Sequence, residues 1–131
     1  MMLKTAIASI LLGCLLTCGM VAGENAPIVS EEAKELAIIS IEGYSQVQDA
    51  AIIQDDYTLS LALIVGWSTS EKYGKELGDN FVRLVKTFSP DDPPGKEIGE
   101  GIYNYIIGVY YPDESELALG AKVSYADHIT W

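Results

Sequence analysis

Cysteine is nearly absent from this sequence. The chain of 131 residues has two cysteines, Cys14 and Cys18, and both lie within the first 23 residues. Residues 24–131 therefore have no thiol that could form a disulfide, bind a metal or act as a nucleophile. This part of the chain must be stabilised by a hydrophobic core, and a chain of about this length is long enough to bury one.

Histidine and basic residues are also scarce. The single histidine, His128, cannot by itself supply the nitrogen and sulfur ligands of an ordinary zinc site. The chain has 8 Lys and Arg against 19 Asp and Glu, which gives a net charge of −11 at pH 7. Such an acidic surface repels phosphate groups, so we expect no nucleic-acid partner.

Motifs that would carry catalysis are missing as well. No serine lies in a glycine pattern of the nucleophile-elbow type, and no glycine-rich phosphate loop is present. With so many acidic residues, some are expected to lie close together without any function. The sequence therefore does not identify a pair of carboxylates for acid–base catalysis. We therefore expect no catalytic residue, no cofactor and no enzyme activity.

Charge is absent from residues 5–23, which follow the single basic residue Lys4. A basic start followed by an apolar run is typical of a secretory signal. The run is close to the lower limit of about 18 to 20 residues for crossing a bilayer, which favours a signal over a permanent anchor. We predict that residues 1–23 are a signal peptide or lipoprotein signal. The protein would then be secreted, periplasmic or on the cell surface.

Two ways of processing this signal remain open. The small residues Val21 and Gly23 permit cleavage before Glu24, which would release a free protein. Residues 15–18, Leu-Leu-Thr-Cys, resemble the lipobox of bacterial and archaeal lipoproteins, in which Cys18 would become the lipidated first residue. In the second case the lipid would tether the protein, and this is the only membrane contact that we expect.

Helix signals and then strand signals follow the signal segment. Residues 24–29 are interpreted as a linker, after which Ser30 is a helix N-cap and Gly43 a stop. From residue 46 the pattern predicts strands over 46–54 and 58–67, joined by a turn at Asp55 and Asp56. Alternation places the odd-numbered residues 59–67, including Trp67, on the core face.

A second helix and a second hairpin complete the chain. Ser68 and Glu71 have the spacing of a capping box, so we predict a helix over 69–87. Strands are predicted over 103–111 and 116–126, and residues 95–105 fit either helix or strand. In the first of these strands the odd-numbered residues 103–111 are expected to face the core. In the second strand the odd-numbered residues 117–125 are expected to face it.

These elements predict one α+β domain over residues 30–131. Its order is helix, hairpin, helix, hairpin (αββαββ). Two helices and four amphipathic strands favour a two-layer sandwich, because both kinds of element must bury one apolar face. We expect the two helices to pack on one face of a four-stranded, mainly antiparallel sheet.

Acidic loops form one candidate site. If the second helix runs antiparallel to the strand before it, its C-terminal end lies near the first hairpin turn. This would bring Asp55 and Asp56 close to Asp91 and Asp92. Carboxylate oxygens are the ligands that calcium prefers. A small-molecule or divalent-cation binding protein that uses these loops is therefore an alternative function.

The second face of the sheet forms another candidate site. Water-facing sheet faces are usually polar, but alternation gives this face little charge. Its apolar members include Ala62, Ile64, Ile106, Tyr110 and Ala118, which we predict to form an interaction surface. We expect this face to be covered by a second copy of the chain or by a partner protein. The leading function is thus an exported or surface-tethered, non-enzymatic protein-interaction module.

Overall fold

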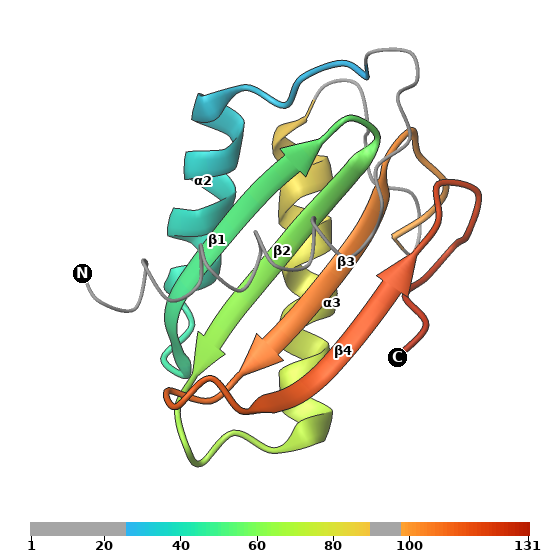
Figure 1. The fold of residues 1–131 in the computed structure, drawn as a ribbon. Helices are drawn as coiled ribbons and strands as arrows, with labels where there is room; N and C mark the ends of the chain where they lie inside the picture. Colours follow the sequence, from blue (N-terminus) through green and yellow to red (C-terminus); the bar gives the residue numbers. More distant parts are fainter. Residues whose placement is uncertain (1–25, 90–97) are drawn as a thin grey trace.

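The computed structural model describes residues 26–89 and 98–131 and has the predicted α+β composition. Its elements are α2 (Glu31–Glu42), β1 (Val47–Asp55), β2 (Thr58–Val65), α3 (Glu71–Phe88), β3 (Asn104–Tyr110) and β4 (Glu116–Lys122). Both helices lie behind one face of the four-stranded sheet (Figure 1). The chain is irregular from residue 98 to residue 103, so β3 begins only at Asn104.

The sheet is mixed, which corrects the prediction of a mainly antiparallel one. Its strand order is β1-β2-β3-β4. β1 pairs with β2 and β3 pairs with β4 in antiparallel fashion, but the central strands β2 and β3 run parallel. The reason is that α3 connects these two strands and carries the chain back to the end of the sheet where β2 begins, as a crossover between parallel strands requires.

The N-cap of each helix is a serine. The Oγ of Ser30 accepts a hydrogen bond from the amide of Ala33 at 3.0 Å, as predicted for α2. In α3 the cap is Ser70, which accepts from the Tyr73 amide at 3.1 Å, so the predicted capping box at Ser68 is wrong. The Ser68 hydroxyl instead donates to Gln46 Oε1 at 3.3 Å.

The main core lies between the helices and the sheet. Its fully buried members include Ile41, Leu59, Leu61, Leu63, Val65, Leu77, Phe81, Val82, Tyr105, Ile107 and Val109. These residues alternate along the strands and recur every three to four residues along α3, as the periodicity predicted. Trp67 was expected in this core but lies beyond the end of β2. It is 62% exposed and stacks on Tyr111 with ring centroids 5.2 Å apart.

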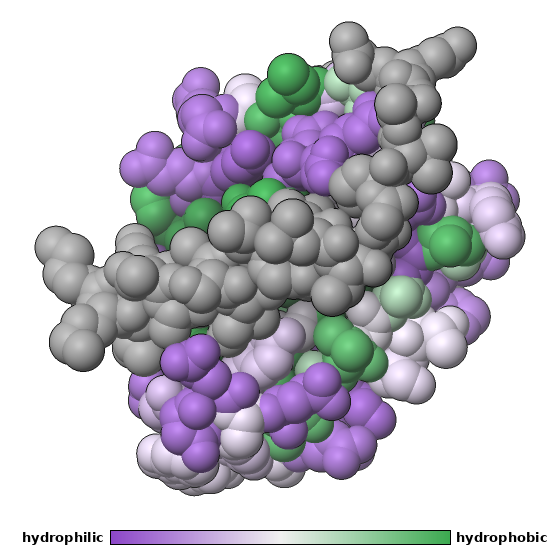
Figure 2. Space-filling model, viewed as in Figure 1, coloured by the Kyte–Doolittle hydropathy of each residue, from purple (hydrophilic) through white to green (hydrophobic). Residues whose placement is uncertain are grey.

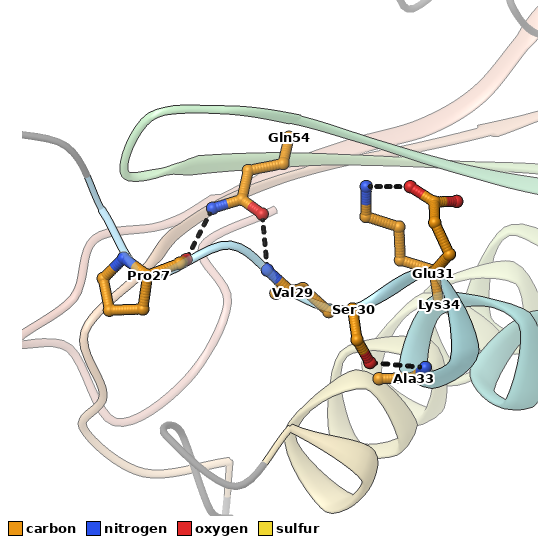
Figure 3. A network of polar contacts seen from close by, with 7 residues as sticks. All are labelled: Pro27, Val29, Ser30, Glu31, Ala33, Lys34 and Gln54. Carbon is orange, nitrogen blue, oxygen red and sulfur yellow. Dashed lines mark hydrogen bonds and ion pairs between the residues drawn. The ribbon is translucent and has the colours of Figure 1, made fainter.

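The segment before α2 is bound to the domain, although residues 24–29 were interpreted as a linker. Ala26 and Val29 are buried in the main core. The Gln54 amide group of β1 accepts from the Val29 amide at 2.8 Å and donates to the Pro27 carbonyl at 2.9 Å (Figure 3). The Tyr103 hydroxyl donates to the same carbonyl. Residues 26–29 are therefore an ordered part of the fold.

In β4 the buried and exposed sides are the reverse of the prediction from Ala118 onward, whereas Leu117 packs against the main core as expected. Leu119 was expected in the core but is 50% exposed, and Val123 and Tyr125, which lie beyond the end of β4, are 42% and 78% exposed. Ala118 and Lys122 are buried on the helix side, opposite Val109 and Tyr105. A register irregularity between Val109 and Tyr110 shifts the pairing. A shift of one residue exchanges the two faces of a strand.

Two glycines explain why this reversed arrangement packs. A Cβ atom on Gly120 would lie 2.7 Å from Trp131 Cε3, and one on Gly78 of α3 would lie 2.5 Å from Trp131 Cη2. The Trp131 ring therefore occupies a slot between β4 and α3 that only glycine leaves open. Thr130 fixes the tail through an antiparallel bridge to Ala121 with hydrogen bonds of 3.0 and 2.9 Å.

Candidate functional site

The side of the sheet that points away from α2 and α3 is the candidate functional site, and it is termed the outer face. Figures 1 and 2 view the molecule from this side. Its side chains come from all four strands, and the strand register places them in rows across the sheet. The outer face consists of Asp49, Ala51, Ile53, Asp55, Thr58, Ser60, Ala62, Ile64, Asn104, Ile106, Gly108, Tyr110, Glu116, Leu119 and Ala121.

The centre of the outer face is apolar and buried. Ala62 and Ile64 have no exposed surface, and the partly buried Ala51, Ile53 and Tyr110 pack against them. This cluster is separate from the main core, because the sheet lies between the two. A two-layer fold normally leaves one sheet face in water, so a second apolar cluster on that face is unusual.

Tyr110 lies flat on the outer face and forms part of its apolar surface. A Cβ atom on Gly108 would overlap with the Tyr110 ring and hydroxyl. Gly108 therefore makes the space in which the ring rests against the sheet. This arrangement presents the broad side of an aromatic ring, which provides a large contact area for a partner.

The polar groups of the outer face are few, and the charged ones among them are acidic. Asp49 is 4% exposed and accepts a hydrogen bond from the neighbouring Ala50 amide at 2.9 Å. The buried Ser60 hydroxyl has no hydrogen-bond partner among the residues that the structure describes. The only basic residue in the four strands is Lys122, whose ammonium lies 5.8 Å from the centre of the Tyr105 ring on the helix side. No cation of the strands therefore faces outward.

Four of the five residues predicted for an interaction surface share the outer face. Ala62 and Ile64 are buried at its centre, and Ile106 and Tyr110 lie beside them on β3. Ala118 does not belong to it, because the reversed β4 buries this residue in the main core. Leu119 takes that place opposite Gly108. Alternation alone missed Leu119, since both sides of β4 contain apolar residues.

The structure describes only two of the four residues of the predicted calcium site, Asp55 and Asp56. Asp55 and Asp56 lie at the β1–β2 turn, and Asp56 Oδ1 accepts from the Ala26 amide at 2.9 Å. This carboxylate therefore has a structural partner. Asp91 and Asp92 lie outside the described residues. Within residues 26–89 and 98–131, the structure has no group of three or more potential metal ligands.

The predicted signal, residues 1–23, and the predicted lipidation site Cys18 lie outside the described residues. Among the helices that are described, none is long and apolar enough to cross a membrane.

Two further surface features were not predicted. The stacked pair of Trp67 and Tyr111 lies at the end of the sheet where β2 and β3 finish, and the Tyr111 hydroxyl donates to the Thr69 carbonyl at 2.8 Å. An open hollow of about 680 Å³ lies between Trp131 and charged residues of α3 such as Lys72 and Glu76.

Comparison with known proteins found no matching family model, no matching curated protein and no matching solved structure. The function must therefore be inferred from the geometry of this chain.

Proposed function

We propose that this protein is an exported or surface-tethered, non-enzymatic protein-interaction module whose outer face is the docking surface. The observation that carries this proposal is the second buried cluster, Ala62 and Ile64, on the side of the sheet that no described helix covers. Burying apolar surface is the main source of free energy in association, at about 25 cal/mol per Å².

The charges around the outer face define the chemistry of the partner. Asp49 lies in the same cross-strand row as Ile64 and Tyr110, and Glu116 pairs with Tyr110 at the far edge of that row. Two copies that met through this face would bring acidic groups together without an outward-facing cation in the strands. We therefore propose a different partner, which presents an apolar segment flanked by basic residues. Complementary charges of this kind favour the correct partner and disfavour others.

The test uses the processed protein, from which the signal has been removed. The described members of the main core lie between Ala26 and Ile129, and the processed protein retains all of them. The probe is a synthetic peptide with an apolar stretch between lysine residues, labelled for fluorescence anisotropy. We expect binding, and we expect Leu119→Lys to weaken it about tenfold, which corresponds to about 1.4 kcal/mol.

The matched control is Ile39→Lys, which changes a 59% exposed residue of α2 on the opposite side of the molecule. This control should bind the peptide like the unmodified protein. Equal loss in both variants, or no binding at all, would overturn the proposal. Sedimentation velocity of the protein alone provides a second readout. A dimer that Leu119→Lys disrupts would identify a second copy as the occupant and exclude the basic partner.

A further inference from the structure

The stacked pair of Trp67 and Tyr111 presents a broad aromatic surface to water. Trp67 lies at the end of the sheet where β2 and β3 finish (Figure 1), and it is 62% exposed. The planes of the two rings are 14° apart, so Tyr111 covers one side of the indole. Exposed tryptophan of this kind is typical of binding surfaces, where Trp, Tyr and Arg supply much of the binding free energy.

The loop that carries Trp67 is fixed from both sides. The Thr69 amide donates to the Gly66 carbonyl at 3.0 Å, which closes a turn around Trp67. The Thr69 hydroxyl donates to Gln46 Oε1 at 3.0 Å, and the Tyr111 hydroxyl donates to the Thr69 carbonyl at 2.8 Å. The indole is therefore held in place before a ligand arrives. Binding to it does not carry the entropic cost of ordering the loop.

The segments that carry the stacked pair contain no basic residue. Residues 44–70 and 104–121 have neither Lys, Arg nor His. The basic residue nearest to Trp67 along the chain is Lys72 of α3, which lines the hollow beside Trp131. The strand and loop segments at this end of the sheet thus supply no cation of their own to the indole.

Carboxylates follow directly after the stacked pair. The turn after β3 is closed on Tyr111, whose carbonyl accepts from the Glu114 amide at 2.8 Å. Three exposed acidic residues lie in this turn and at the start of β4: Asp113, Glu114 and Glu116. No ion pair within the described part of the chain involves them. A cation at this end would gain from these charges and from the negative face of the indole.

We propose that the Trp67 indole, together with the neighbouring carboxylates, binds the guanidinium group of an arginine in the partner protein. This inference rests on the proposed function, because the arginine would belong to the basic flank of the segment that docks on the outer face. Ile64 and Tyr110 are paired in the last row of that face. Trp67 follows Ile64 by three residues, and Tyr111 follows Tyr110 directly. The stacked pair therefore adjoins the end of the outer face.

The combination of a flat ring and free carboxylates selects arginine among possible ligands. A planar guanidinium can lie on the indole while the N–H groups at its edge donate in pairs to a carboxylate. The lysine ammonium is a compact and strongly hydrated charge, so it cannot make both contacts in this way. A neutral ligand such as a sugar could stack on the ring, but it would gain nothing from the negative charge.

The test compares two peptides on the processed protein by fluorescence anisotropy. The peptides share one apolar stretch, which is flanked by arginine in one and by lysine in the other. We expect the arginine peptide to bind about fivefold more tightly, which corresponds to about 1 kcal/mol. Trp67→Ala should abolish this preference. The matched control Tyr57→Ala removes a 36% exposed aromatic residue beside Asp55 and Asp56, at the opposite end of β1 and β2, and should retain it.

A second measurement does not depend on the outer face. N-acetylarginine amide and N-acetyllysine amide are titrated separately into the isotope-labelled processed protein, and the indole signals are followed by NMR. The chain has two tryptophans, so Trp67→Phe assigns the Trp67 signal. We expect the arginine compound to shift this signal more than the lysine compound does at equal concentration. Replacing Glu114 and Glu116 together by Gln should reduce the arginine-induced shift, because the indole then lacks these neighbouring charges.

The outcomes separate this inference from the proposed function. Equal affinity of the two peptides, equal shifts with the two compounds, or the same loss of preference in Tyr57→Ala as in Trp67→Ala would overturn the arginine site. Peptide binding that Leu119→Lys weakens, without any preference for arginine, would reject the arginine site alone. An arginine-selective shift of the Trp67 signal without binding of either peptide would reject the outer face as the docking surface and retain the arginine site.

Discussion

Gly78 and Gly74 of α3 offer a matched pair of substitutions that tests the packing of Trp131. Alanine is favoured over glycine in a helix interior by about 1 kcal/mol, so on helix propensity alone both Gly→Ala changes should stabilise the protein. The two sites differ in what the added methyl group would contact. We expect Gly74→Ala to raise the free energy of unfolding and Gly78→Ala to lower it.

The magnitudes follow from the neighbours of each added Cβ atom. At position 78 it would lie 2.5 Å from Trp131 Cη2 and 3.0 Å from Ile107 Cγ2. Overpacking of this kind costs about 1 to 3 kcal/mol, which outweighs the helix gain and gives a net loss of about 1 kcal/mol. At position 74 the close contact is the flexible end of Leu117 at 2.8 Å. A small rotation of that side chain relieves it, so most of the gain of about 1 kcal/mol remains.

Urea unfolding followed by far-ultraviolet circular dichroism measures both changes without relying on tryptophan fluorescence. A double-mutant cycle with Trp131→Ala isolates the contact, because Gly78→Ala should become neutral or stabilising once the ring is removed. The reasoning is refuted if Gly78→Ala is as stable as Gly74→Ala. It is also refuted if the effect of Gly78→Ala is the same within about 0.5 kcal/mol with and without the Trp131 ring.

Two further predictions concern polar contacts. Gln54→Leu leaves the Val29 amide without its partner and removes one of the two hydrogen bonds to the Pro27 carbonyl, so the free energy of unfolding should fall by about 1 to 3 kcal/mol. Unchanged hydrogen exchange at the Val29 amide would contradict this. The hydroxyl and then the amide of Ser115 donate to Asp113 and lower the pKa of its carboxyl group. Because the folded pKa is the lower one, this contribution to stability is present above the ordinary carboxyl pKa and is lost as the pH falls through the folded value. In an NMR titration Ser115→Ala, which removes the hydroxyl donor and keeps the amide donor, should raise the Asp113 midpoint, and an unchanged midpoint would exclude the hydroxyl hydrogen bond as a cause.

Local patterns predicted the elements well where the signal itself is local. Ser30 and Gly43 bound α2 because a cap needs only the first or last turn of its helix. The β1–β2 hairpin follows from two strand patterns that flank a short acidic turn. The start of α3 was misplaced because Ser68 and Ser70 are both good caps. The choice between them depends on Gln46, which binds the Ser68 hydroxyl from a distant part of the sequence.

Part of the outer face was also predictable. Ala62, Ile64, Ile106 and Tyr110 were placed on it by alternation, since side chains alternate strictly along a regular strand. Ala118 was misplaced because the register irregularity beside Tyr110 is not visible in the sequence of β4. The same irregularity explains why Lys122 is buried although it is charged, and why Leu119 is exposed although it is apolar.

The sequence by itself determined the number and type of the described elements, the net negative charge and the absence of thiols from residues 24–131, because these depend on composition and on short-range periodicity. Only the tertiary structure decided that β2 and β3 run parallel and which side of β4 is buried. Both depend on contacts between distant segments, namely the crossover through α3 and the Trp131 slot formed by Gly78 and Gly120. A side chain in β4 has no preference between two apolar faces until α3 and the C-terminal tail pack against one of them.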